Sequence, residues 1–151
     1  MALNTEIAFL SKVPLFEGFS EEMLRLLAFG SERRSVSKDR YLFHEGTAAD
    51  CAFVVMDGRL ELTRKDRRGK SIVVGTAIRG DLLGELAIIS QTDRRMTAMA
   101  LEDSDVMRIN RPMFKRMMEE YPEVAILLRK RISRNISEML RGIETLAPNF
   151  E

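Results

Sequence analysis

The sequence predicts an α+β fold, in which an antiparallel β-roll of about eight strands, similar to a jelly roll, lies between N-terminal helices and a long C-terminal helix. Hydrophobic residues repeat with helical spacing before about residue 30 and again after residue 111, whereas they alternate within 36–110. Glycine-containing turns divide this middle segment into short strands, which is typical of a roll and not of βαβ units. With 151 residues, the chain is expected to form a single domain over 1–151.

Composition and charge indicate an ordinary globular protein. Hydrophobic residues make up 45% of the chain and charged residues 31%, and the formal net charge is +1, so no overall field attracts nucleic acid or anionic membranes. No apolar run approaches the roughly 20 residues of a membrane span, and the N-terminus lacks the apolar core of a signal peptide. The single cysteine, Cys51, excludes an internal disulfide and fits a reducing compartment, so a cytoplasmic location is expected.

The N-terminal segment, 1–35, is expected to be helical. Pro14 interrupts the first apolar pattern, so two helices are expected rather than one. Ser20 followed by Glu21 and Glu22 is typical of an N-cap and the acidic first turn of the second helix.

Two turns give the clearest signals within the expected β-roll, 36–110. Asp57-Gly58 predicts a β-hairpin after the strand at 52–56. The run from Asp66 to Gly69 predicts a second turn before the strand at 71–78. Further strands are expected at 41–44, 96–100 and 106–109.

Two helices are expected in the C-terminal segment, 111–147. Arg111-Pro112 begins the first helix, because proline is tolerated in the first turn. Tyr121-Pro122 ends it, and a long helix follows from about Glu123 to Gly142.

The long helix carries one apolar stripe, with residues three or four positions apart. The stripe is longer than a small roll can cover, so it is expected to be the seam of a homodimer, with packing on the chain's own roll as the alternative. The basic run from Arg129 to Arg134 lacks aromatic neighbours, so we expect a solvated helix face and no direct DNA binding. The expected dimer contacts are Leu128, Ile132, Ile136, Met139 and Ile143.

The segment GELAIISQTDRRMTA, which begins at Gly84, combines residues that suit an anionic ligand. A short helix is expected after Gly84-Glu85, and a helix N-terminus presents free N–H donors to an anion. Arg94 or Arg95, returning on the next strand, can add a charge-assisted contact to a phosphate. Glu85 would be repelled by a phosphate and suits a hydroxyl group such as a ribose 2′-OH. This set suggests a nucleotide whose ribose and phosphate lie close together.

The longer stretch LGELAIISQTDRRMTAMALEDSDVMRI resembles the phosphate-binding cassette of the cyclic nucleotide-binding domain, as in the catabolite activator family and the regulatory subunits of cyclic-nucleotide-dependent kinases. The resemblance extends over nearly the whole chain: FLSKVPLFEGFSEEMLRLLAFGSERRSV resembles the helical lead-in, and YLFHEGTAADCAFVVMDGRLEL the first strands. It implies a β-roll with the cassette at 83–97 and a cyclic nucleotide as ligand. Bacterial members pair through the C-terminal helix, which implies a homodimer here.

The resemblance also implies roles for individual residues. Glu85 would bind the ribose 2′-OH and Arg94 the exocyclic oxygen of the cyclic phosphate, with backbone amides around Leu86 and Ala87 contributing. Two neighbours of Arg94 depart from the family's pattern, which has small residues there. The first of them lacks a hydroxyl for guanine, so cAMP is expected and cGMP is the alternative. The expected ligand-binding set is Gly84, Glu85, Leu86, Ala87, Arg94, Arg95 and Met96.

No catalytic or metal site is expected from the sequence. Arg68-Gly69-Lys70-Ser71 resembles the end of a P-loop, but Arg64 stands where the first glycine should be and the segment lies in a hairpin. His44 is the only histidine, which excludes a His-rich metal site, and no third partner accompanies His44 and Cys51. A non-enzymatic protein without a cofactor is therefore expected.

The expected function is a cyclic nucleotide sensor. Ligand phosphate would draw the helix at 84–89 and Arg94 together, and thereby reposition the long C-terminal helix. The alternative is a ligand-free module that dimerises or docks a partner protein through the long helix, with its arginines solvated or paired with Glu102 or Asp103. A third interpretation is a regulatory unit whose output domain is another polypeptide.

Overall fold

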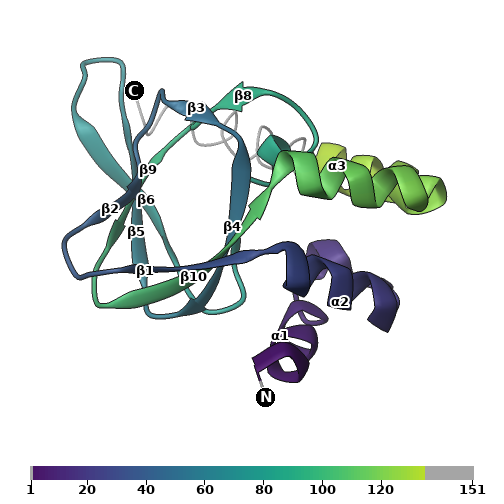
Figure 1. The fold of residues 1–151 in the computed structure, drawn as a ribbon. Helices are drawn as coiled ribbons and strands as arrows, with labels where there is room; N and C mark the ends of the chain where they lie inside the picture. The colour runs from purple at the N-terminus through teal and green to yellow at the C-terminus, as the bar shows by residue number, and fades with distance from the viewer. Residues whose placement is uncertain (1, 135–151) are drawn as a thin grey trace.

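A computed structural model describes residues 2–134 of the chain (Figure 1). The helices are α1 (Ala2–Leu10), the 3₁₀ helix η1 (Pro14–Phe16), α2 (Glu21–Gly30), the 3₁₀ helix η2 (Glu85–Ile88), α3 (Arg111–Glu120) and a further helix at 122–134. The strands are β1 (Glu32–Val36), β2 (Tyr41–Phe43), β3 (Ala48–Ala49), β4 (Cys51–Asp57), β5 (Leu60–Lys65), β6 (Ser71–Ala77), β7 (Leu82–Leu83), β8 (Thr92–Asp93), β9 (Thr97–Ala100) and β10 (Ser104–Asn110).

The strands form the predicted antiparallel roll. One four-stranded sheet has the order β1-β10-β4-β7 and the other has the order β2-β9-β5-β6, while β3 and β8 form a two-stranded pair. The described residues contain ten strands, whereas about eight were expected. The difference arises from β3, β7 and β8, which are only two residues long. Strands this short carry no readable alternation, so the sequence does not reveal them.

Strand β4 separates two hydrophobic cores. Ala52 and Val54 pack against the helices, whereas Phe53 and Val55 face the interior of the roll. Successive side chains of a strand point to opposite faces, so a strand covered on both sides is continuously apolar. Figure 1 shows the helical cover on one side of the roll, next to β4 and β10, and this arrangement leaves the roll interior free to form a site.

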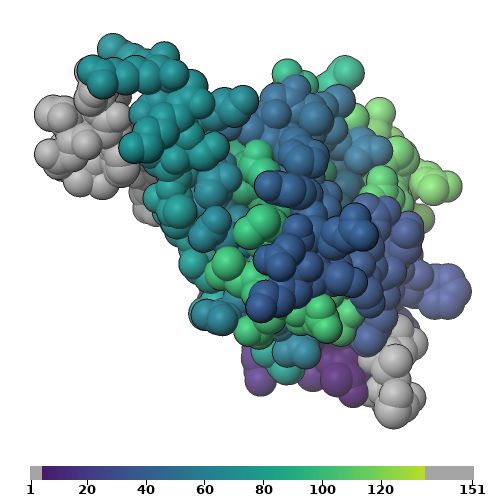
Figure 2. All heavy atoms as spheres, turned by 90° about the vertical axis from the view of Figure 1, so that its left-hand side faces the viewer, coloured from purple at the N-terminus to yellow at the C-terminus, as the bar shows by residue number. Residues whose placement is uncertain are grey.

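Several sequence predictions are confirmed at element boundaries. The Ser20 hydroxyl accepts a hydrogen bond from the Met23 amide at the start of α2. The turn from Asp66 to Gly69 joins the paired strands β5 and β6. This hairpin projects from the teal side of the molecule in Figure 2. Helix α3 begins at Arg111 and ends before Tyr121, as expected.

The Asp57-Gly58 hairpin prediction is wrong. Strands β4 and β5 belong to different sheets, so this turn carries the chain from one sheet to the other. Gly58 has φ of 90°, and a Cβ there would lie 2.7 Å from the Cα atom of Ser104. Glycine is thus required, but for a crossing between sheets rather than for a two-residue hairpin.

The expected boundary between the helical segment and the roll, at residue 36, lies too late. Strand β1 already begins at Glu32 and pairs along its length with β10. Four of its five residues are exposed, because β1 is an edge strand with one neighbour. Its charged sequence therefore hides the strand from a search for apolar alternation.

The prediction that Leu128 and Ile132 form a dimer seam is corrected by their burial. Each is 1% exposed and belongs to the core between the helices of this chain. The N-terminal segment covers this stripe: Nη1 of Arg131 donates hydrogen bonds to the carbonyl oxygens of Leu15 at 3.1 Å and Glu17 at 2.6 Å. The expectation of a fully solvated basic face is therefore wrong at Arg131. The other expected dimer contacts, Ile136, Met139 and Ile143, lie outside the described residues.

Within residues 2–134, no helix combines the length and apolar character required to cross a bilayer.

Candidate functional site

The candidate site is a cavity of about 210 Å³ in the roll. All seven residues of the expected ligand-binding set line it. They come from η2 with the preceding Gly84 and from residues 94–96, directly after β8, and η2 and β8 are in contact. Phe43 of β2 and Leu62 of β5 contribute apolar walls from the opposite sheet. The cavity thus combines a polar segment with an apolar surface, as nucleotide sites require.

Gly84 has a conformation that few other residues would adopt. Its φ of 78° and ψ of 35° place it in the left-handed region just before η2. A Cβ at this position would lie 2.5 Å from Nη1 of Arg94. The glycine therefore allows both the turn and the close approach of the guanidinium group to the backbone.

The expected helix after Gly84 is shorter and tighter than predicted. It is a 3₁₀ helix of four residues, Glu85–Ile88. The Ala87 amide donates a hydrogen bond to the Gly84 carbonyl oxygen at 2.9 Å, so this amide is engaged within the turn. Ala87 is buried and forms part of the cavity wall, and in this structure its N–H is not available to a ligand.

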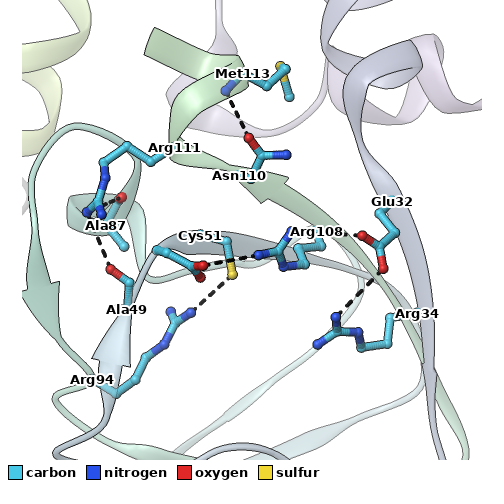
Figure 3. Close-up of polar contacts among 11 residues, drawn as sticks. Glu32, Arg34, Ala49, Cys51, Ala87, Arg94, Arg108, Asn110, Arg111 and Met113 are labelled. Atoms are coloured by element: carbon cyan, nitrogen blue, oxygen red, sulfur yellow. Dashed lines mark hydrogen bonds and ion pairs between the residues drawn. The ribbon is translucent and has the colours of Figure 1, made fainter.

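Arg94 is a buried cation. Arg94 is only 7% exposed, and its Nη2 donates a hydrogen bond to Sγ of Cys51 at 3.2 Å (Figure 3). The guanidinium carbon lies 4.5 Å from the ring centroid of Phe43 and 5.4 Å from that of Phe53. Among the described residues, Nη1 is buried without a hydrogen-bond partner. A buried charged group with an unsatisfied donor is costly, which points to an anionic partner from outside the chain.

The backbone fixes Arg94 in this place. Its amide donates to the Thr47 carbonyl oxygen at 2.7 Å, and its carbonyl oxygen accepts from the Gly46 amide at 2.8 Å. These bonds extend the pairing of β3 with β8. The arginine is therefore anchored at both its backbone and its guanidinium group, which reduces the entropy lost on ligand binding.

The remaining expected residues differ in exposure. Glu85, Leu86 and Met96 are half-buried, and Arg95 is exposed. Arg95 is thus exposed and also lines the cavity, which is present despite this bulky residue. The alternative in which Arg94 pairs with acids of the 102–105 turn is not observed: Glu102 pairs with Arg59 at 3.2 Å, and Asp103 accepts from the Lys38 amide.

Charges and burial near Arg94 set the protonation of two neighbours. Burial raises the pKa of the Cys51 thiol, although the Arg94 charge opposes this effect. Burial also raises the pKa of Asp50, but a hydrogen bond with Cys51 and the charge of Arg108 outweigh it, so the pKa is lowered overall. At neutral pH the thiol is therefore neutral and the carboxyl group is charged.

Two further residues at the site were not expected from the sequence. Nη1 of Arg111, at the start of α3, donates to the carbonyl oxygen of Ser90 at 2.8 Å. Longer bonds join the same atom to the carbonyl oxygens of Ala87 and Ala49 (Figure 3). Cys51 was expected to be a small buried side chain, which is confirmed, but its contact with Arg94 spans 43 positions in the chain. Spacing along the sequence offers no signal for contacts this distant.

No cluster of three or more histidine, cysteine, aspartate or glutamate side chains suited to a metal ion occurs within the described part of the chain.

Comparison with known proteins provides independent evidence. The family model described as "Cyclic nucleotide-binding domain" matches residues 33–121, which include the whole roll after the first residue of β1, the cavity and α3. The structure of a cyclic nucleotide-binding-like protein from Brucella abortus is 41% identical with a TM-score of 0.68, covering 76% of this chain and 98% of that one. The regulatory domain of Toxoplasma gondii PKA, crystallised with cAMP, is 25% identical with a TM-score of 0.75, covering 87% of this chain and 50% of that one.

Among curated proteins, the lysophospholipase nte1 of Emericella nidulans is 25% identical over 142 residues, which are 94% of this chain. The match covers only 9% of that protein, so the chain corresponds to one small part of a much larger polypeptide. The match of the family model over more than half of the chain, on the same residues that form the roll and its cavity, shows that this chain belongs to the cyclic nucleotide-binding domain family.

Proposed function

We propose that this chain binds a cyclic nucleotide, with cAMP as the preferred ligand, and acts as a sensor or regulatory domain. The observation that carries the proposal is the buried Nη1 of Arg94, which has no partner among the described residues and lies against Gly84 in the cavity. The cyclic phosphate supplies the missing negative charge and hydrogen-bond acceptor. Glu85, which follows Gly84 and also lines the cavity, accepts a hydrogen bond from the ribose 2′-OH.

The preference for cAMP rests on the residue beside Arg94. Arg95 offers no hydroxyl group to a guanine, and Thr97, whose hydroxyl accepts a hydrogen bond from the Glu45 amide at 2.9 Å, is not part of the cavity lining. The apolar walls from Phe43 and Leu62 suit either purine. cGMP is therefore the comparison ligand for the test.

The bonds of Arg111 suggest how ligand binding is communicated. This side chain joins the carbonyl oxygens at the end of η2 to the first turn of α3. We infer two arrangements of η2 and Arg94, each with its own position of α3 and the helix at 122–134. A ligand shifts the equilibrium between them only to the extent that it binds one arrangement more tightly than the other. The chain then acts as a non-catalytic regulator of an output domain or of a partner protein.

Thermal unfolding with and without nucleotide tests the proposal. A cAMP concentration 100-fold above Kd stabilises the folded state by about 2.7 kcal/mol, which raises the Tm by roughly 5–10 °C for a chain of this size. Arg94→Ala removes charge-assisted hydrogen bonds and should weaken binding about 10- to 150-fold. Arg95→Ala is the matched control and should retain binding, because its side chain is exposed.

The role of Glu85 is tested with 2′-deoxy-cAMP. If Glu85 accepts the ribose hydroxyl, Glu85→Ala should weaken cAMP binding to about the affinity of 2′-deoxy-cAMP for the wild-type protein. The same substitution should then leave the affinity for 2′-deoxy-cAMP unchanged. Absence of any Tm shift with either natural nucleotide would overturn the proposed function.

The exposed face of the helix at 122–134 favours a second activity, dimerisation or partner docking. Ile126 is 59% exposed and Leu127 is 43% exposed, although the opposite side of the same helix is buried in the core. Apolar residues exposed together on a helix are typical of contact surfaces. We therefore propose homodimer or partner contacts through this face, in place of the seam expected at Leu128 and Ile132.

A further inference from the structure

Among the described residues, the Arg94 guanidinium group contacts uncharged groups. Its partners are Sγ of Cys51 at 3.2 Å and the rings of Phe43 and Phe53. No carboxylate within residues 2–134 forms an ion pair with it, although the residue is 7% exposed. A buried arginine is usually paired with an acid, because an isolated charge is strongly disfavoured in a low dielectric.

We propose that Cys51 is the positioning residue of the anion site: its neutral sulfur orients the guanidinium group of Arg94 without neutralising it, so that the positive charge is reserved for the ligand's phosphate. The inference rests on the proposed nucleotide-binding function and assigns to one residue of β4 a role in selecting and holding the anion. Sulfur is a weak acceptor, so it restricts the rotamer of Arg94 but competes poorly with a phosphate oxygen.

The acid next to Cys51 forms its ion pair with Arg108 and not with Arg94, although its carboxylate also hydrogen-bonds with the thiol. Asp50, immediately before the strand, is exposed and pairs with Arg108 at 3.3 Å. Cys51 is 2% exposed and its sulfur faces Arg94 (Figure 3). A one-residue shift in register would exchange these positions, because side chains alternate between faces. A carboxylate would then occupy the place that a ligand phosphate must fill.

Burial keeps the Cys51 thiol, which contacts Arg94, in its neutral form. It raises the pKa of the Cys51 thiol, so the sulfur remains protonated at neutral pH and presents no negative charge to Arg94. The titratable and charged groups around the thiol are Arg94, Arg108 and Asp50. The two cations oppose the effect of burial, and they do not reverse it.

Substitutions at position 51 give distinct predictions for cAMP affinity. Cys51→Ser keeps a small neutral acceptor and should change Kd less than about 3-fold. Cys51→Ala removes the acceptor and should weaken binding by about 10-fold, since the guanidinium group is then less restricted. Cys51→Asp should weaken binding by about 100-fold or more, because an internal carboxylate takes the place of the phosphate. If Cys51 positions Arg94, Cys51→Ser should bind cAMP more tightly than Cys51→Ala. If Cys51 only fills space, the two variants should have the same affinity for cAMP.

A double-mutant cycle without ligand tests the contact independently of nucleotide binding. Cys51→Asp should reduce the denaturation midpoint more in the Arg94→Ala background than in the wild-type background, because Arg94 is the cation in direct contact with position 51 and its loss leaves the buried carboxylate with only the more remote charge of Arg108. Non-additivity supports the positioning contact. Additive effects overturn the proposal, and so does a Cys51→Asp variant that binds cAMP as tightly as the wild type. A wild-type protein that binds neither nucleotide overturns the proposed function, while the cycle still decides whether Cys51 holds Arg94.

Discussion

Arg94 and Gly84 act as a pair at the scale of single residues. The left-handed conformation of Gly84 opens the turn into η2, and its lack of a Cβ leaves room for Nη1 of Arg94. The guanidinium group is thereby placed beside the backbone of the cassette, held by a thiol and two aromatic rings. These contacts preorganise a positive charge in a buried site, which is the physical requirement for holding a phosphate in water.

Gly84→Ala should reduce both stability and cAMP affinity. The left-handed backbone costs about 1–2 kcal/mol for a residue with a Cβ, and the new methyl group would also displace the Arg94 guanidinium. Gly69→Ala is the matched control, because Gly69 also has a positive φ of 80° but no atom within 4 Å of an added Cβ. Chemical denaturation should show a loss for both variants, whereas calorimetry should show weakened binding for Gly84→Ala alone. Equal affinities in the two variants would contradict the proposed close contact with Arg94.

The Cys51 thiol should give stability a pH dependence in the alkaline range. Because the folded-state pKa is raised above its ordinary value of 9.0, the folded protein retains a proton that the unfolded chain releases. This contribution is fully present below pH 9.0 and is lost as the pH rises through the folded-state pKa. Unfolding free energies from pH 8 to about 10.5 should therefore decline less steeply for Cys51→Ser than for the wild type. Parallel curves would show that this thiol does not titrate differently on folding.

The start of α3 is connected to η2 and the residues after it by the side chain of Arg111. Helix α3 begins with the Asn110 side chain accepting from the Met113 amide at 2.8 Å, so its N-terminus is fixed. Arg111, the next residue, bonds to the carbonyl oxygens of the cassette. A single arginine thus links the phosphate-binding segment to the helical cover, over a short and well-packed path.

Arg111→Ala should loosen η2 relative to α3. Three hydrogen bonds to backbone carbonyl oxygens are lost, although two of them are long, so a destabilisation of about 1–2 kcal/mol is expected. Amide hydrogen exchange should rise in 85–90 and in the first turn of α3, and the protection that cAMP confers on α3 should diminish. Lys115→Ala, on the exposed face of α3, is the control and should leave both unchanged. Unaltered exchange in Arg111→Ala would show that the link does not couple the two elements.

Two substitutions on the helix at 122–134 separate folding from association. Ile132→Glu places a charge in the core and should destabilise the fold by more than about 3 kcal/mol. Ile126→Glu is on the exposed face and should leave the unfolding midpoint within about 0.5 kcal/mol of wild type. Sedimentation analysis should show that Ile126→Glu alone converts a homodimer to a folded monomer. A folded Ile132→Glu protein with normal stability would contradict the intrachain packing described for this helix.

The whole molecule shows which features the sequence can predict. The roll, its helical cover and the set of cavity residues follow from glycine punctuation, apolar periodicity and the resemblance of the cassette. Strand β1 was missed because an edge strand tolerates charge, and the Asp57-Gly58 turn was misassigned because the same signal serves a crossing between sheets.

The features that the sequence does not predict are contacts between residues far apart in the chain. Leu128 and Ile132 are buried in a core shared with N-terminal residues, and Arg131 of the same helix bonds to Leu15 of η1, which a helical stripe alone does not reveal. The contact of Cys51 with Arg94 likewise arises from the pairing of β3 with β8. In both cases the sequence indicates that the residue is apolar or buried, but the residues that it contacts are decided by the tertiary fold.

In the proposed site, the buried charge of Arg94 receives the phosphate of a cyclic nucleotide. The most direct measurement is calorimetric titration of cAMP into the wild-type protein, with Arg94→Ala and Arg95→Ala titrated in parallel. We expect saturable binding to the wild type and to Arg95→Ala, with affinity weakened about 10- to 150-fold or lost in Arg94→Ala. Binding of equal strength in all three proteins, or no binding of cAMP or cGMP to the wild type, would contradict this expectation.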